Sequence, residues 1–184
     1  MDTIVAKITN DSLTDKKIYE QAGKILREGG LVAFPTETVY GLGADALDEE
    51  ASAKIYAAKG RPSDNPLIVH IADIEALYKL SCEVPDKALK LADKFWPGPL
   101  TMILKKKDKV PDSITGGLGT VAIRMPSHKV AAELIRTSGV YIAAPSANTS
   151  GKPSPTRASH VIKDLSGKID MIIEDDTVDI GVES

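Results

Sequence analysis

Short apolar runs alternate along this chain with segments whose apolar residues recur at helical spacing. The runs 31–34 and 140–144 are each followed by a proline, which is typical of buried strands that stop abruptly. The stretch 14–28 carries an apolar stripe and is followed by two glycines, which is typical of a helix. Interleaved strands and helices predict an α/β fold, with a twisted mixed sheet of parallel and antiparallel strands flanked by helices.

Two long stretches without predicted structure, 35–48 and 145–155, both follow apolar strands. Ligands in open α/β sheets bind beyond the carboxyl ends of strands, so these loops are the first candidates for a binding site. We expect a single domain over residues 1–184, because no linker, repeat or low-complexity tract interrupts the pattern. The predicted strands are 4–8, 31–34, 67–71, 100–105, 120–125, 140–144 and 169–174, and the predicted helices are 14–28, 49–59, 74–81, 85–95, 128–138 and 156–165.

Charge and cysteine content narrow the class of protein. The chain has 23 Lys and Arg against 26 Asp and Glu, a net charge of −3, which argues against holding nucleic acid by bulk charge but allows a local basic cleft. Cys82 is the single cysteine, so an intrachain disulfide is impossible and a reducing compartment is indicated. The amino terminus lacks the apolar core of a signal peptide, and no apolar run approaches the roughly 20 residues of a membrane span. We therefore expect a cytoplasmic protein without membrane contact.

The first candidate segment, 35–44, places hydroxyls and the Glu37 carboxylate at the end of a predicted strand. Gly41 and Gly43 follow and would let the backbone approach a ligand closely. The segment does not fit a dinucleotide fingerprint, because six residues separate Phe34 from Gly41 and no clear helix starts there. A plain structural turn is the alternative.

The second segment, 59–66, carries two cations around a glycine. In an extended segment, side chains two residues apart point the same way, so Lys59 and Arg61 could bind one polyphosphate together. The alternative is a solvated pair that stabilises the end of a helix. His70 lies on the next predicted strand, where a structural role is the commoner one.

Two further segments combine polar side chains with small residues. On the strand 120–125, Thr120, Ala122 and Arg124 share one face, which is either a ligand surface or the solvent side of an edge strand. The loop 145–155, with Ser146 and Asn148, leads into a predicted helix. Backbone N–H groups at the start of a helix can bind an anion. The alternative for this loop is an ordinary Ser/Pro-rich connection with a helix cap.

Taken together, these segments closely resemble the YrdC-like threonylcarbamoyl-AMP synthase family, over nearly the whole chain from about residue 12 to 184. Each tripeptide alone is a weak signal, whereas their joint occurrence in order is specific. The matching motifs are Phe34-Pro35-Thr36-Glu37-Thr38-Val39-Tyr40-Gly41-Leu42-Gly43, Lys59-Gly60-Arg61 as the KxR signature, Phe95-Trp96-Pro97-Gly98-Pro99-Leu100-Thr101, and Ser146-Ala147-Asn148 as the SxN signature.

The resemblance implies an enzyme, a nucleotidyltransferase with a YrdC-like fold and a concave basic cleft. L-threonine and bicarbonate or CO₂ would give an N-carboxy species, which attacks the α-phosphorus of ATP to yield threonylcarbamoyl-adenylate and pyrophosphate. Mg²⁺ would enter with ATP. Partner threonylcarbamoyl transferase proteins would then place the group on an adenosine of tRNA.

The resemblance also implies site residues. On the threonine side they are Thr36, His70, Arg124, the backbone near Ala144, and Ser184. On the nucleotide side they are Lys59, Arg61, Asn65, Thr120, Ser146, Asn148 and Ser154, of which Lys59, Arg61, Ser146 and Asn148 would be catalytic. No residue is an evident general base or enzyme nucleophile, and the spacing of His70, His128 and His160 indicates no metal site.

Two alternatives and one departure accompany this interpretation. The run 105–107 of three lysines, with Lys152 and Arg157, keeps open a double-stranded RNA- or tRNA-binding module without synthase activity. A sugar-phosphate enzyme would need an acidic metal cluster, which the sequence does not offer. The family sequence normally continues past Ser184 with Thr-Val, apparently within a Gly-x-Glu-Ser-Thr-Val segment, so we expect impaired closure of the two pockets in a chain that stops there.

Overall fold

A computed structural model describes residues 2–175 and 180–181 of the chain. The strands are β1 Ile4–Lys7, β2 Val32–Pro35, β3 Tyr40–Asp45, β4 Ile68–His70, β5 Thr101–Lys105, β6 Thr120–Arg124, β7 Ile142–Ala143 and β8 Met171–Glu174. The helices are α1 Ser12–Arg27, α2 Glu49–Lys59, α3 Glu75–Leu80, α4 Asp86–Phe95, α5 Asp112–Thr115, α6 Lys129–Ser138 and α7 Ala158–Leu165.

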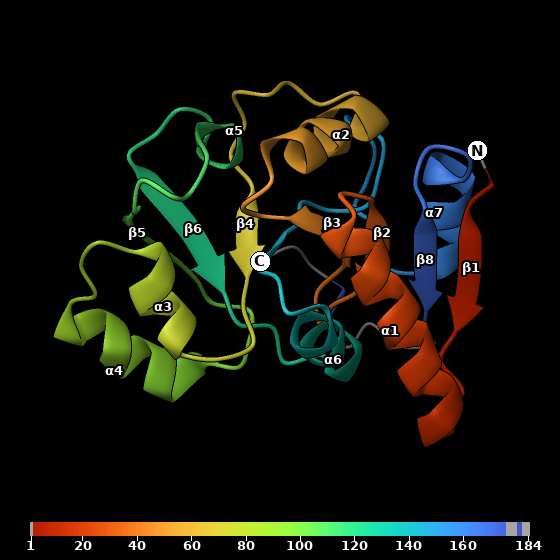
Figure 1. Cartoon of the computed structure of the whole chain (residues 1–184), viewed down its shortest axis with the longest axis horizontal. Coiled ribbons are helices and arrows are strands. Elements are labelled where there is room, and N and C mark those ends of the chain that lie inside the picture. Colours follow the sequence, from red (N-terminus) through yellow and green to blue (C-terminus); the bar gives the residue numbers. More distant parts are fainter. Residues whose placement is uncertain (1, 176–179, 182–184) are drawn as a thin grey trace.

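The strands described form a single sheet in the order β1-β8-β2-β3-β7-β4-β6-β5 (Figure 1). β8 is parallel to both β1 and β2, and β4 is parallel to β6. The other neighbouring pairs are antiparallel. The predicted α/β fold with a mixed sheet is therefore confirmed.

Two apolar clusters pack against opposite faces of this sheet. Along β2, Val32 and Phe34 join the cluster formed with α1 and α6, whereas Ala33 joins the cluster formed with α2, α3 and α7. This alternation follows from the two-residue period of a strand. Figure 1 shows α1 and α6 side by side on one face of the sheet. A sheet covered on both faces leaves its strand ends as the natural place for a ligand.

Helix boundaries follow ordinary capping chemistry. The Asp48 carboxylate accepts hydrogen bonds from the backbone N–H groups of Glu50 and Ala51 at the start of α2. Gly60 ends the same helix with a φ of 61°, a left-handed conformation that glycine adopts without a Cβ clash. Within the residues described, no helix combines the length and apolar character needed to cross a bilayer.

The expectation of an irregular segment over 35–48 was wrong, because β3 occupies residues 40–45 and pairs with β2 as an antiparallel hairpin. The two glycines that suggested a loop serve packing within the sheet. A Cβ placed on Gly43 would lie 2.6 Å from Ile142 Cγ2 and 2.8 Å from Phe34 Cε1. Gly43 therefore makes room both for Ile142 of the neighbouring strand β7 and for the Phe34 ring across the hairpin. The short helix α5 was also not predicted.

Candidate functional site

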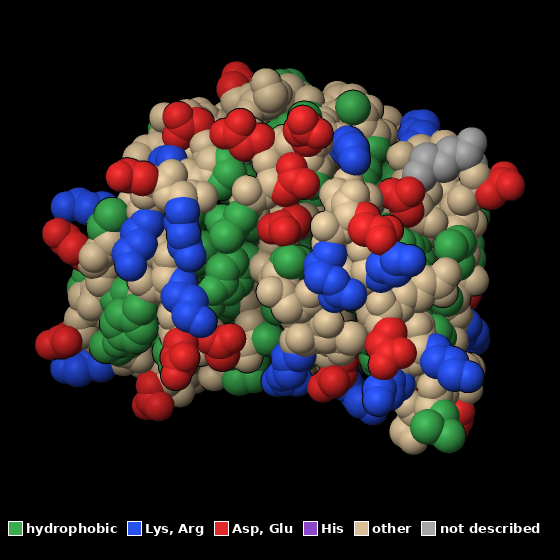
Figure 2. Space-filling view, in the orientation of Figure 1, with side chains coloured by type: hydrophobic (Ala, Val, Ile, Leu, Met, Phe, Trp, Pro, Cys, Tyr) green, Lys and Arg blue, Asp and Glu red, His purple; other side chains and the backbone are tan. Residues whose placement is uncertain are grey.

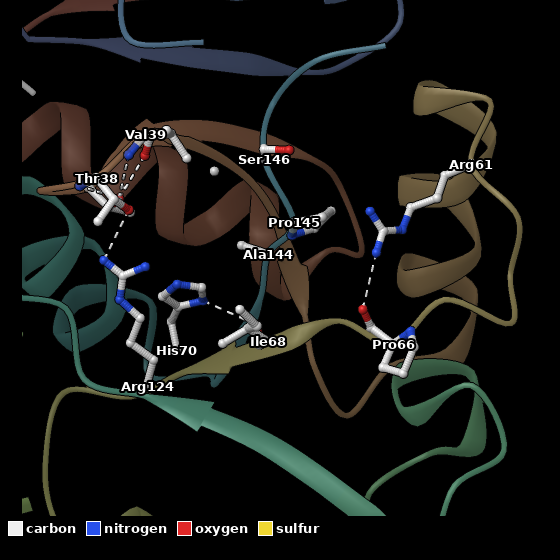
Figure 3. A pocket seen from close by; sticks show the side chains of 12 residues that line it. Thr38, Val39, Arg61, Pro66, Ile68, His70, Arg124, Ala144, Pro145 and Ser146 are labelled. Atoms are coloured by element: carbon white, nitrogen blue, oxygen red, sulfur yellow. Dashed lines mark hydrogen bonds between the residues drawn. The ribbon is translucent and has the colours of Figure 1, made fainter. Parts of the chain in front are cut away.

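A pocket of about 210 Å³ opens where β2 and β6 end and where the chain leaves β7 (Figure 3). This is the strand-end position that the loop argument predicted. Its walls come from the turn between β2 and β3, the segment from Arg61 to β4, the end of β6 and the loop after β7. The lining residues are Thr36, Thr38, Val39, Gly41, Arg61, Pro66, Ile68, His70, Arg124, Ala144, Pro145 and Ser146.

The pocket brings together residues predicted for both substrates. Thr36, His70, Arg124 and Ala144 from the threonine side line it together with Arg61 and Ser146 from the nucleotide side. In Figure 3, Arg124 and His70 lie on one side, Arg61 lies opposite, and the chain from Ala144 to Ser146 runs between them. The geometry thus joins the segments that the sequence separates.

Five residues predicted for the nucleotide side do not belong to the described lining, namely Lys59, Asn65, Thr120, Asn148 and Ser154. One residue predicted for the threonine side cannot be placed. Asn65 is exposed and Thr120 is half-buried on β6, and neither belongs to the described lining. Ser154 lines a different hollow together with Lys152 and His160. Ser184 lies outside the described residues.

The structure contradicts the prediction that residues 59–61 form an extended segment. Lys59 is the last residue of α2, and the left-handed Gly60 turns the chain, so Lys59 and Arg61 do not point the same way. Lys59 is 1% exposed. Its Nζ donates to the carbonyl oxygen of Ser146, and it lies 2.7 Å from the carbonyl oxygen of Asn148. The ammonium therefore ties the end of α2 to the 146–148 loop.

The same loop is braced from within. Asn148 is buried, and its Nδ2 donates to the carbonyl oxygens of Thr149 at 3.0 Å and Lys152 at 2.7 Å. The backbone N–H of Ala147 donates to the Tyr40 carbonyl at 2.8 Å. These bonds leave the Ser146 side chain at the pocket while fixing the backbone around it.

His70 is neutral in this structure at physiological pH. Burial, reinforced by the nearby positive charge of Arg124, lowers the pKa of its imidazole from 6.5 to about 4. Its Nδ1 lies 3.1 Å from the carbonyl oxygen of Ile68, and its ring meets the Phe34 ring edge-on at 6.3 Å between centroids. A neutral imidazole can order a ligand through hydrogen bonds without adding charge to the pocket.

Arg124 lies in a buried ion pair that the predicted site did not include. Its Nη2 is 2.8 Å from Glu37 Oε1, and the two side chains are 3% and 4% exposed. The same nitrogen donates to Thr38 Oγ1 at 3.2 Å. Glu37 and Thr38 belong to the candidate segment 35–44 but were not among the predicted site residues, although a carboxylate and hydroxyls near the end of an apolar strand were a signal that could have found them.

Guanidinium groups on facing walls, with hydroxyls and a neutral imidazole between them, suit a ligand with two anionic ends. Arginine binds carboxylate and phosphate through paired N–H donors. No acidic residue belongs to the described lining. A carboxylate near Arg124 and a phosphate near Arg61 are the ligand groups that this arrangement favours.

The lysines that suggested RNA binding are engaged elsewhere. Lys106 Nζ donates to the Val110 carbonyl at 2.6 Å, and Lys107 Nζ donates to the Tyr78 carbonyl at 2.6 Å. Lys152 Nζ lies 2.6 Å from Asp164. Figure 2 shows basic and acidic side chains interspersed over the face in view, not gathered into one basic band.

Known proteins are similar in sequence to this chain over most of its length. The Sua5/YciO/YrdC family profile, described as "Telomere recombination", matches residues 24–184. A threonylcarbamoyl-AMP synthase of Pyrococcus abyssi is 58% identical over 182 residues, which cover 99% of this chain and 53% of that protein. A protein of Methanocaldococcus jannaschii named putative threonylcarbamoyl-AMP synthase is 39% identical over 159 residues, which cover 86% of this chain and 74% of that protein.

Solved structures also have folds similar to that of this chain. The crystal structure of Pyrococcus abyssi Sua5 complexed with L-threonine superposes with a TM-score of 0.94 at 55% identity, covering all of this chain and 53% of that one. Escherichia coli YciO shares the fold, with a TM-score of 0.81 at 24% identity, and covers all of this chain and 86% of that one. The chain spans about half the length of the Pyrococcus relative.

Proposed function

Because this chain belongs to the Sua5/YciO/YrdC family, we propose that it is a threonylcarbamoyl-AMP synthase acting on L-threonine, bicarbonate or CO₂, and ATP. The observation that carries the proposal is the single pocket in which Arg124 and Arg61 come from facing walls. One molecule with a carboxylate and a second with phosphates fit such a pocket better than either alone. The names of the similar proteins support the same reaction.

The chemistry requires positioning and charge neutralisation more than an enzyme nucleophile. The threonine nitrogen bonds to the carbon of CO₂ and loses a proton, giving a carbamate. A carbamate oxygen then bonds to the α-phosphorus of ATP while the bond to the bridging oxygen breaks, and pyrophosphate leaves. Arg124 holds the threonine carboxylate, and Arg61 offsets charge on the phosphates.

The 146–148 loop and Lys59 support the nucleotide side. The Ser146 hydroxyl faces the pocket, and the buried Lys59 ammonium donates hydrogen bonds to carbonyl groups of the loop. Mg²⁺ enters with ATP as part of the substrate. Because no carboxylate belongs to the described lining, the phosphates themselves are the ligands expected to carry this ion.

The product needs an acceptor. A threonylcarbamoyl-adenylate is an activated mixed anhydride, so transferase proteins that act on tRNA adenosine are the partners we propose, and a cytoplasmic location fits them. Direct RNA binding by this chain would be weak and secondary.

The proposal is tested by exchange of labelled pyrophosphate into ATP, with threonine and bicarbonate each omitted in turn. Exchange that needs both is the expected result, because the adenylate forms only from the carbamate. Exchange that ignores both would refute the proposal, and RNA affinity without any threonine binding would favour the RNA-binding alternative.

A further inference from the structure

Glu37 contacts Arg124 without belonging to the described lining of the pocket. Its Oε1 is 2.8 Å from Arg124 Nη2, and its side chain is only 4% exposed. Burying an ion pair costs desolvation energy that the pair's attraction often only just repays. Stability alone is therefore a weak explanation for placing a carboxylate there.

The carboxylate is held in its charged form. Burial tends to raise the pKa of Glu37, but the adjacent positive charge of Arg124 outweighs burial and lowers that pKa. Glu37 is thus ionised across the physiological range. An ionised partner fixes a guanidinium more strongly than a neutral acceptor does.

The turn that carries Glu37 links several pocket groups. Thr38 Oγ1 accepts from Arg124 and lies 3.1 Å from Thr36 Oγ1. Thr36 Oγ1 in turn donates to the Val39 carbonyl at 2.7 Å. The backbone carbonyl of Glu37 accepts a hydrogen bond from the N–H of Ile180 at 2.8 Å, which further anchors the turn.

We propose that Glu37 is a positioning residue, which acts through Arg124 to orient the guanidinium toward the carboxylate of the amino-acid substrate. The inference rests on the proposed function. It concerns one wall only, since Arg61 comes from the opposite wall and donates instead to the Pro66 carbonyl at 3.3 Å. Loss of the Glu37 charge should therefore affect threonine and spare ATP.

The test compares Glu37→Gln with Glu133→Gln by titration calorimetry, using L-threonine and ATP separately. Glu133 forms an ion pair with Arg136 at 2.9 Å that is largely exposed, so it is a matched control for the same chemical change. We expect Glu37→Gln to weaken threonine binding about tenfold, the typical loss for a misoriented charged hydrogen bond, with ATP binding unchanged. Glu133→Gln should change neither.

Glu37→Asp keeps the negative charge on a side chain that is one methylene shorter, so it should bind threonine more tightly than Glu37→Gln does. If Glu37→Gln does not fold, Glu37→Asp carries the same comparison, with a smaller expected loss. Threonine binding that is unchanged or tighter in a folded Glu37 variant would overturn the inference alone, as would equal losses for both ligands. Absence of threonine binding in the unaltered chain would overturn the proposed function and this inference with it.

Discussion

The two arginines of the pocket are held in contrasting ways. Arg124 is buried against the Glu37 carboxylate and the Thr38 hydroxyl, in a network that reaches Thr36. Arg61 is half-buried on a connecting segment, and the hydrogen bond described for it is one of 3.3 Å to the Pro66 carbonyl. One wall is therefore preorganised for a small ligand, whereas the other retains freedom to follow a larger one.

Replacing the braced arginine should produce the largest effect. Arg124→Ala leaves the Glu37 charge buried without this partner, so we expect the free energy of unfolding to fall by about 3–5 kcal/mol. Threonine binding should also be lost. Urea denaturation measures the first effect and calorimetry the second. The double variant Glu37→Gln/Arg124→Ala is the control, because it should regain part of the stability; no recovery would show that the pair is not the cause.

Acidification should have the second largest effect on the free energy of unfolding, because it protonates His70. The pKa of His70 is about 4 in the folded chain and near 6.5 when unfolded, so the unfolded state binds more protons between those values. The stabilisation is complete above pH 6.5 and is lost as pH falls toward 4. We expect a loss of about 2–3 kcal/mol between pH 7 and 4.5 by urea denaturation. His70→Gln should lose distinctly less over the same interval, and equal losses in both proteins would contradict the assignment.

Removing the loosely held arginine should have the smallest effect on the fold. Arg61→Ala should change the free energy of unfolding by no more than about 0.5 kcal/mol, as is usual for a side chain with few contacts. ATP binding should weaken about tenfold, the expected loss of one charged contact, while threonine binding stays the same. ATP affinity that is unchanged would remove Arg61 from the nucleotide side.

The sequence was sufficient for the fold class and for half of the residues that line the pocket. Apolar periodicity located β2, β4, β6 and β7, whose ends carry Thr36, His70 and Arg124. It failed at β3, where Gly41 and Gly43 lower strand propensity. Close contacts with Phe34, Ile142 and Ala144 explain these glycines only in the folded chain. Sequence periodicity also failed at Lys59, because a left-handed Gly60 is invisible to a period-two argument. The contacts of Glu37 depend on tertiary structure and could not be derived from spacing.

Phe34 is buried in the apolar cluster formed with α1 and α6. Its ring occupies the space that a side chain at Gly43 would need and meets the edge of the His70 imidazole. Any ligand that pressed His70 against Phe34 would have to displace a ring packed within the core, which is costly. The Phe34 contact therefore limits how far the His70 ring can shift toward the core when a ligand binds.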